Sequence, residues 1–368
     1  MHNLEQLSLG AAVGLIMALV LMLIMGNPLI NWLREKSWRK GTPNWEVRED
    51  TPDTHKAKQG TPSMGGLGIA LCVALTLLSA VFLELAVIIK SWHYSVGVTF
   101  VSLGLLLVTQ LPLPFLFFGH MYLGFVDDWS KAADRGGLRA LAKLGTQIVL
   151  AGFFVLLVLW IAQNPGLNLY NNDVYQQFAE VALSAWWWAI PVIMFTIIAI
   201  GNAVNLTDGL DGLATGLALQ SLFAIALLSD SWTIQYLFLA VAGACLGFLF
   251  FNRHPARIFM GDTGSLALGA LIGGGAVLLG GIFLLPFVAF IFIVEMLSVI
   301  VQVAWFKYTR RKTGEGKRLL KRAPLHHHFE LCGWSEWRVV LTFWGINLVT
   351  TVAGLLLWNS GMLPKWPM

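Results

Sequence analysis

Residues 96–131 read VGVTFVSLGLLLVTQLPLPFLFFGHMYLGFVDDWSK, and residues 96–126 of this stretch contain no Asp, Glu, Lys or Arg. An uncharged apolar run of this length can cross the hydrocarbon core of a bilayer, which takes about 20 helical residues. Two adjacent carboxylates, Asp127 and Asp128, follow at once. The stretch therefore predicts a membrane-spanning helix that carries two acids where it reaches the water.

The composition supports the same fold class for the whole chain. The 368 residues are 57% hydrophobic and 12% charged, whereas a soluble domain has about 25% charged residues. Open sheets leave backbone groups unpaired in lipid, and barrels show short alternating segments rather than long apolar ones. We predict an all-α, polytopic integral membrane protein with a single domain over residues 1–368. We expect the first apolar stretch, 9–30, to be retained as a span and not cleaved as a signal peptide.

Apolar segments recur from end to end and predict about ten transmembrane helices. Their approximate ranges are 9–33, 64–89, 95–126, 140–162, 186–205, 212–229, 232–251, 263–280, 282–306 and 338–358. The boundary inside 263–306 depends on Gly280 and Gly281 alone, as the signal for a turn.

The loops between these segments predict an orientation. If every segment crosses, loops 34–63, 127–143, 206–211, 252–262 and 307–338 lie on one side and hold 22 of the 24 Lys and Arg residues. The positive-inside rule makes that side cytoplasmic, so both termini face outward. The longest outward loop, 163–185, is polar, and we interpret it as a solvated connector.

Acidic residues from three separated segments fall on the predicted cytoplasmic face, where ionisable residues at spans usually mark function. They are Asp127 and Asp128 in GFVDDW, Asp208 and Asp211 in NLTDGLDG (205–212), and Asp262 in FMGDTGS (259–265). Asp208 and Asp211 share a helical face by their spacing, and Asn205 joins it if the turn is helical. Several carboxylates suit a hard cation such as Mg²⁺, which binds one or two of them and substrate phosphates.

The same face is also basic. Around the first acidic pair lie Lys56, Lys58, Lys131, Arg135, Arg139 and Lys143, and the last cytoplasmic loop contains KYTRRKTGEGKRLLKR at 307–322. Carboxylates for a metal and cations for phosphate are the parts of a phosphoryl-transfer site. GDTGS opens a new span, and helix N-termini attract anions. Juxtamembrane Lys and Arg also serve topology and anionic-lipid binding, so both interpretations stay open for each basic residue.

Three consecutive histidines, His326, His327 and His328, stand in APLHHHFE at 323–330. On a regular helix they point about 100° apart and cannot all bind one metal, whereas two could converge in a loop after Pro324. They suit a phosphate or sugar, as neutral or charged imidazoles. A zinc site would need further Cys or His nearby, and Cys332 is the only one. We expect the three cysteines, which include Cys72 and Cys245, to be packing residues without a disulfide.

Taken together, these motifs resemble the polyprenyl-phosphate N-acetylhexosamine-1-phosphate transferases. The matching stretches are TPSMGG (61–66), GFVDDW (124–129), GNAVNLTDGLDGLA (201–214), FMGDTGSLALG (259–269), VEMLSVIVQV (294–303) and KRAPLHHHFEL (321–331). The last of them is specifically similar to the phospho-N-acetylmuramoyl-pentapeptide transferase family. The resemblance implies transfer of phospho-MurNAc-pentapeptide from its UDP carrier to undecaprenyl phosphate at the bacterial cytoplasmic (inner) membrane. Lipid I and UMP are the implied products, and Mg²⁺ is the implied cofactor.

The resemblance also implies roles for individual residues. Catalytic roles fall to Asp127, as base or nucleophile, and to Asp128 and Asp262; metal ligation falls to Asp262, Asp128 and Asp208. The implied substrate-binding residues are Lys58, Lys131, Asn205, Asp208, Asp211, Asn252, Phe259, His326, His327 and His328. The expected partners are UDP-MurNAc-pentapeptide, undecaprenyl phosphate and membrane lipids; a homodimer is a candidate assembly, and nucleic acid is not expected.

Two alternatives compete with this interpretation. A sibling enzyme that transfers GlcNAc-1-phosphate would share the acidic motifs and differ in sugar choice, which we assign to residues 307–331. A secondary transporter would carry its charges near the membrane midplane between internal repeats. Here the acidic motifs stand at predicted span ends and no internal repeat is visible, which disfavours a transporter.

Overall fold

The computed structural model describes residues 9–40, 60–90, 111–133, 136–164, 172–184 and 186–364, and all the regular elements in these ranges are helices. The helices of the first half are α1 (Leu9–Lys40), α2 (Gly66–Lys90), α4 (Pro112–Ala132), α5 (Ala140–Gln163), α6 (Asn172–Ser184) and α7 (Trp186–Thr207). Those of the second half are α8 (Leu213–Leu228), α9 (Trp232–Asn252), α10 (Gly261–Leu278), the 3₁₀ turn η3 (Ile282–Leu284), α11 (Leu285–Val288), α12 (Phe290–Thr313), α13 (Leu325–Leu331) and α14 (Glu336–Asn359). The predicted all-α class is confirmed.

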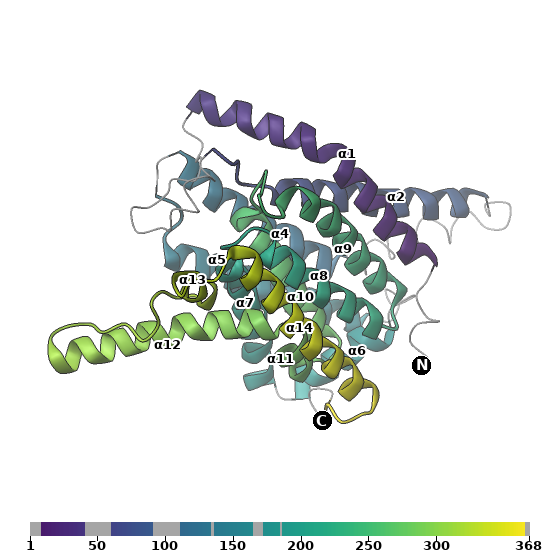
Figure 1. The fold of residues 1–368 in the computed structure, drawn as a ribbon. Helices are drawn as coiled ribbons and strands as arrows, with labels where there is room; N and C mark the ends of the chain where they lie inside the picture. Colours follow the sequence, from purple (N-terminus) through teal and green to yellow (C-terminus); the bar gives the residue numbers. More distant parts are fainter. Residues whose placement is uncertain are drawn as a thin grey trace.

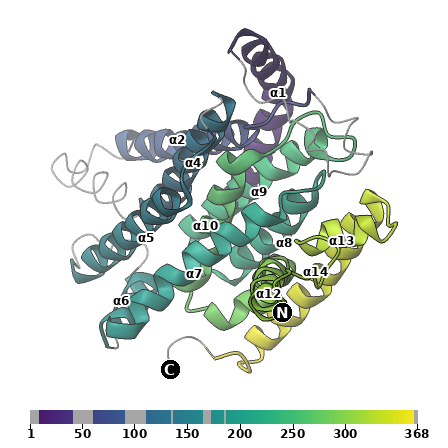
Figure 2. The same cartoon turned by 90° about the vertical axis from the view of Figure 1, so that its left-hand side faces the viewer.

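Two apolar helices, α9 and α10, form the centre of the bundle (Figures 1 and 2). Helix α10 packs between α4 and α7, and α9 packs against α1 and α8. Every residue of α10 from Thr263 onward is buried. The helix is rich in glycine, which lets neighbouring backbones approach closely, as is typical of helices that pack inside membranes.

The outer helices are apolar on their exposed sides as well. Large hydrophobic side chains are exposed along α1, α5, α12 and α14, for example Ile24, Val149, Ile300 and Val349. In water such surfaces would cost free energy, whereas lipid tails solvate them. Figure 1 shows part of α12 projecting beyond the other helices, and Figure 2 views this helix close to end-on. The distribution fits an integral membrane protein.

Seven of the described helices are long and apolar enough to cross a membrane. They are α1, α5, α7, α9, α10, α12 and α14. Three further predicted spans coincide with α2, α4 and α8, of which α2 and α8 contain shorter apolar stretches. A multi-pass membrane protein is therefore confirmed, while the count of ten and the outward orientation of the termini stay predictions.

The interpretation of 163–185 as a connector is wrong for its second half. Residues 172–184 form α6, and Tyr175, Phe178, Ala179 and Ala182 are buried. These four positions follow the spacing of one helical face, so a stripe of apolar residues offsets the polar composition of the segment. The predicted span 282–306 is also interrupted, because α11 ends at Val288 and α12 begins at Phe290. Gly280, with φ of 68°, forms the expected turn before it.

The cysteine prediction holds for two of the three residues. Cys72 and Cys245 are buried free thiols, as expected for packing residues. Cys332 is a free thiol as well, but it is exposed, so its assignment as a packing residue is wrong.

Candidate active site

Four acids gather where the ends of α4, α7 and α10 meet, and we call Asp127, Asp128, Asp208 and Asp262 the carboxylate cluster. Asp127 and Asp128 lie near the end of α4, and Asp262 lies in the first turn of α10. The two helices touch at Gly124, where an added Cβ would overlap the backbone oxygen of Asp262. The absence of a side chain at Gly124 is what allows the acids of α4 and α10 to approach each other.

Asp128 binds the start of α10. Its Oδ2 accepts hydrogen bonds from the backbone N and Oγ1 of Thr263 at 2.9 and 2.7 Å, and its Oδ1 accepts from the backbone N of Asp262 at 3.2 Å. Amides in the first turn of a helix have no partner within the helix. Asp128 therefore caps α10 from a neighbouring helix and fixes the position of Asp262. Both its oxygens are directed at α10, so this arrangement fits an orienting role better than the predicted metal ligation.

Two lysines bridge Asp127 and Asp262. Lys131 Nζ lies 3.0 Å from Asp127 Oδ2 and 2.9 Å from Asp262 Oδ2. Lys143 Nζ, from α5, lies 3.3 and 2.7 Å from the same two oxygens. The other oxygen of Asp127 accepts a hydrogen bond from the backbone N of Leu138 at 2.7 Å. Ammonium groups held among carboxylates in this way are well placed to bind phosphate oxygens.

Asn205 and Asp208 complete the site from α7 and the turn that follows it. Asn205 Nδ2 donates to Asp262 Oδ1 at 2.8 Å and to Ser265 Oγ at 2.9 Å. Burial, together with the charges of Asp262 and Asp128, raises the pKa of Asp208 to about 8. Burial is the larger cause of this shift, and the nearby carboxylates add to it. A divalent cation would relieve the crowding, and the oxygen donors of Asp262 and Asp208 are of the type that Mg²⁺ prefers.

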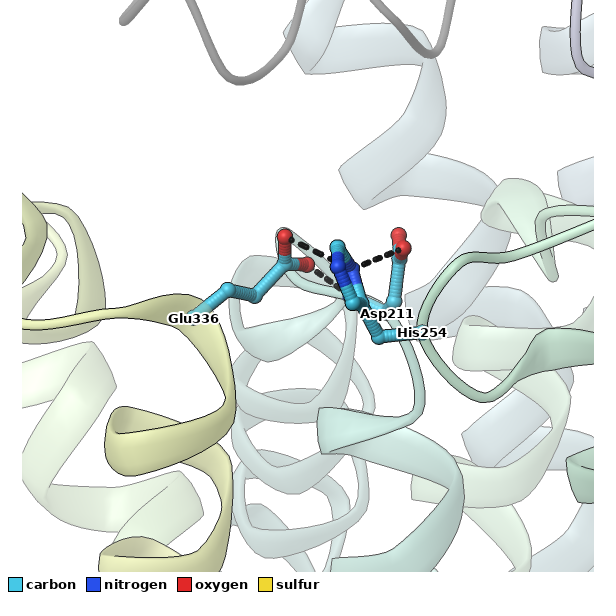
Figure 3. Close-up of side chains that lie close together, drawn as sticks. All are labelled: Asp211, His254 and Glu336. Atoms are coloured by element: carbon cyan, nitrogen blue, oxygen red, sulfur yellow. Dashed lines mark hydrogen bonds and ion pairs between the residues drawn. The ribbon is translucent and has the colours of Figure 1, made fainter.

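Asp211 does not share a face with Asp208, so that prediction is wrong. Helix α7 ends at Thr207, and the chain then turns. Asp211 Oδ2 lies 3.0 Å from His254 Nδ1, which is 3.2 Å from Glu336 Oε2 (Figure 3). The backbone N of Asp211 also donates to Glu336 Oε1 at 2.7 Å. This Asp211–His254–Glu336 triad joins the turn after α7, the segment after α9 and the start of α14.

The triad is also the only group of three described His, Cys, Asp or Glu residues whose ligand atoms all lie within 4.8 Å of one another. Its contacts do not require a metal, however. Asp211 Oδ2 accepts a further hydrogen bond from the backbone N of Ala256 at 3.0 Å, Glu336 Oε1 accepts from the backbone N of Asp211, and His254 Nδ1 lies between the two acids. The arrangement is that of a bridge between three segments that are separate in the sequence.

The three histidines lie on a short helix, α13, and not in a loop. His326 is fully buried against Glu295 of α12, with its Nδ1 3.2 Å from Glu295 Oε2 and its backbone N donating to Glu295 Oε1 at 3.0 Å. Its Nε2 lies against Gly209, where an added Cβ would overlap it. One histidine of the motif therefore contacts the turn that carries Asp208.

The other two histidines make polar contacts of their own. His327 Nδ1 lies 2.9 Å from Glu330 Oε2, and burial lowers the pKa of His327 to about 4. His328 Nδ1 accepts from the backbone N of Lys321 at 3.1 Å, and its Nε2 lies 3.8 Å from Cys332 Sγ. No metal-ligand group of three among the described residues includes any of the three histidines. The rings of His326 and His327 nevertheless lie side by side, with their centroids 4.2 Å apart, so two of the three histidines converge, although on a helix and not in a loop.

Two further predicted binding residues support the backbone near the site. Asn252 is buried, accepting from Thr215 Oγ1 at 2.8 Å and donating to the backbone oxygen of Ile258 at 3.0 Å. Phe259 pairs through its backbone with Pro62 and Gly65 of the TPSMGG stretch. Lys58, together with Lys56 and Arg135, lies outside the described residues.

Sequence reasoning did not single out three residues that the structure places at or beside the site. Lys143 counted only as one of several basic residues, although it bridges Asp127 and Asp262. Glu295 is an ionisable residue inside an apolar segment. Such residues usually mark a functional site, so this signal could have identified Glu295 from the sequence. Glu336 follows Ser335, which caps α14 through Arg338 N, and nothing local in the sequence indicates its contact with Asp211.

Comparison with known proteins adds to this geometry. Residues 111–280 match the family described as glycosyl transferase family 4. Three similar relatives are each named phospho-N-acetylmuramoyl-pentapeptide-transferase. The protein of Bacillus cytotoxicus is 39% identical over 84% of this chain and 87% of its own length. The protein of Oceanobacillus iheyensis is 37% identical over 94% and 97%, and that of Chloroherpeton thalassium is 34% identical over 94% and 91%.

Proposed function

The chain belongs to the phospho-N-acetylmuramoyl-pentapeptide-transferase family, and from this premise we propose the substrates, cofactor and residue roles at the carboxylate cluster. Its function is the transfer of phospho-N-acetylmuramoyl-pentapeptide in peptidoglycan synthesis, which sets the transporter alternative aside. We propose UDP-MurNAc-pentapeptide as the donor and undecaprenyl phosphate as the acceptor. Lipid I and UMP are then the products, formed at the inner face of the bacterial cytoplasmic membrane.

The observation that carries this proposal is the pair of lysines shared by Asp127 and Asp262. Phosphoryl transfer depends on positioning and on cations that stabilise charge on the transferring group. Lys131 and Lys143 supply two cations from α4 and α5 at one point. A lipid phosphate at the membrane surface and a nucleotide pyrophosphate from the cytoplasm can both reach the ends of these helices.

We propose Mg²⁺ as the cofactor, bound by Asp262 and Asp208. The reason for a cation here is that several carboxylates lie close together in a buried place; burial first, and then the charges of Asp262 and Asp128, raise the pKa of Asp208. When bound, a divalent cation supplies charge neutralisation at the phosphates. Asp128 holds the first turn of α10 in place, and Asn205 orients Asp262.

We propose direct transfer in a single step. An oxygen of the lipid phosphate attacks the phosphorus that is attached to the sugar, a new P–O bond forms, and the bond to the UMP oxygen breaks. The second pKa of a phosphate is about 6, so the attacking oxygen is largely ionised at neutral pH and needs little help from a base. Asp127 then serves chiefly to hold Lys131 and Lys143, and it assists proton removal at lower pH. His326, beside Gly209, and its neighbours His327 and His328 would contact the nucleotide-sugar.

The experiment that tests this function compares two donors. Purified protein receives undecaprenyl phosphate, Mg²⁺ and either UDP-MurNAc-pentapeptide or UDP-GlcNAc, and UMP release is measured. We expect release only with the pentapeptide donor and only when lipid phosphate is present. Turnover of UDP-GlcNAc alone would instead identify the sibling activity. UMP formed without lipid phosphate, with a phospho-sugar retained on Asp127, would replace direct transfer by a two-step route.

A further inference from the structure

A hydrogen bond between a buried amide and a half-buried one lies beneath the carboxylate cluster. Asn202 Nδ2, on α7, donates to Gln147 Oε1, on α5, at 3.0 Å, and also to the backbone oxygen of Ile198 at 2.8 Å. Gln147 is only 1% exposed. Polar side chains inside membrane helices are rare and usually functional, yet neither amide contacts an acid of the cluster in any hydrogen bond that the described residues show.

The positions of the two amides along their helices suggest why they are there. Gln147 follows Lys143 by four residues on α5, and Asn202 precedes Asn205 by three on α7, so each amide shares a helical face with a residue of the site. Lys143 Nζ lies 2.7 Å from Asp262 Oδ2, and Asn205 Nδ2 lies 2.8 Å from Asp262 Oδ1. The faces of α5 and α7 that contact the two oxygens of Asp262 are thus joined, one turn deeper in the bundle, by the hydrogen bond between Asn202 and Gln147.

Helix α5 exposes apolar side chains on one side near its start. Its first three turns expose Leu141, Leu144, Ile148 and Val149. Apolar contact with lipid is non-directional, so it does not fix the rotation of α5 about its own axis. A hydrogen bond between amides is directional, and that between Gln147 and Asn202 sets the rotation that brings Lys143 over Asp262.

Gln147 makes no competing bond. Its Nε2 is buried and has no hydrogen-bond partner among the described residues. A Cβ added at Gly201 would lie 3.7 Å from this nitrogen, in ordinary contact. Buried amide donors normally have a partner. At Gln147 the N–H donor has none among the described residues, and the only side-chain hydrogen bond is the one that its oxygen accepts from Asn202. If the position served only for packing, an apolar side chain of similar shape would fill it without leaving a buried donor unsatisfied.

We infer that Gln147 is a positioning residue: through Asn202 it aligns α5 with α7 so that Lys143 and Asn205 both hold Asp262. It touches no substrate and acts through the site residues. The inference rests on the proposed phosphoryl transfer at the carboxylate cluster.

The test replaces Gln147 by Met, which has a similar length and cannot accept this hydrogen bond. We expect Gln147→Met to lower kcat by about 10–100-fold, as the loss of a residue that orients ligands does. The Mg²⁺ concentration for half-maximal activity should rise, while the KM for the nucleotide-sugar changes less. Gln147→Glu, which keeps an oxygen acceptor at the same reach, should restore most of the rate.

A matched control exists in a second amide pair. Asn347 Nδ2, on α14, donates to Gln220 Oε1, on α8, at 2.9 Å. Gln220→Met removes this hydrogen bond and the one from Gln220 Nε2 to the backbone oxygen of Trp344, both between helices that carry no acid of the cluster, and kcat and the Mg²⁺ requirement should stay near those of the unsubstituted protein. Thermal midpoints of all variants show whether folding is preserved.

The results separate the two hypotheses. If the unsubstituted protein releases UMP but Gln147→Met has the same kcat and Mg²⁺ requirement, the positioning role is overturned and the proposed function stands. Equal losses in Gln147→Met and Gln220→Met, matched by equal falls in thermal midpoint, would also overturn it, because they indicate a purely structural bond. If Gln147→Met does not fold, the Gln147→Glu variant decides. A folded but inactive Gln147→Glu variant would overturn the positioning role. An inactive unsubstituted protein would instead refute the function.

Discussion

Replacing Asp262 by Asn should reduce UMP release by about 1,000-fold or more without unfolding the protein. Asp262 is the acid at which the contacts of the site converge: Lys131, Lys143 and Asn205 all bind its carboxylate. Asn keeps the volume and removes the negative charge. Removal of one preorganised electrostatic contact from a site typically costs about 100–1,000-fold, and Asp262 is also the principal proposed ligand of the cation.

Folding should tolerate this change. Loss of the Asp262 charge breaks its ion pairs with Lys131 and Lys143, but both lysines keep Asp127 as a partner, and the repulsion of Asp208 and Asp128 by Asp262 is removed. An acid in the first turn of a helix stabilises it by only about 0.3–1 kcal/mol. The matched control is Asp230→Asn, an exposed acid in the short connection between α8 and α9, which should keep full activity. Near-normal turnover of Asp262→Asn at limiting Mg²⁺ would remove Asp262 from the site.

Replacing Gly124 by Ala should also inactivate the protein, by at least about 100-fold, through geometry alone. An added Cβ at Gly124 would overlap the backbone oxygen of Asp262 and lie 2.6 Å from the backbone N of Thr263. Backbone atoms cannot rotate away as a side chain can, so α4 and α10 must separate. A displacement of about 1 Å in a catalytic site can cost about 100-fold in rate, and here it moves Asp127 and Asp128 away from Asp262.

Gly145→Ala is the matched control for this substitution. Gly145 lies on an exposed part of α5, and an added Cβ there would meet nothing within 4 Å. Ala favours a helix over Gly by about 1 kcal/mol, so this variant should be as active as the unsubstituted protein and slightly more stable. Rates and thermal midpoints, measured on the monodisperse fraction, would check both. A fully active Gly124→Ala variant would show that the tight approach of α4 to α10 is unimportant.

Features that depend on composition and spacing were predictable from the sequence. Long apolar segments and a low charge content indicated a helical membrane protein, and the acids in GFVDDW, NLTDGLDG and FMGDTGS indicated one site. The structure brings Asp127, Asp128 and Asp262 together. Their chemical roles stay predictions, as does the binding of Mg²⁺.

Features that depend on the direction of a side chain were not predictable. Asp211 turns to His254 because α7 ends at Thr207, four residues earlier than the shared helical face requires. Lys143 is distinguished from other lysines only by the packing of α5 beside α4. Gln147 and Asn202 are far apart in sequence, and only the contact of α5 with α7 pairs them. Each case rests on tertiary contacts that no local pattern contains.

The most direct test of the account is the location of the cation. Crystals grown with Mn²⁺, which accepts the oxygen ligands that suit Mg²⁺, and with the nucleotide-sugar would show the ion by anomalous scattering. We predict one strong peak within about 2.0–2.3 Å of a carboxylate oxygen of Asp262. The contradicting result is a peak at the Asp211–His254–Glu336 triad with none at Asp262, because the carboxylate cluster would then not be the metal-dependent centre.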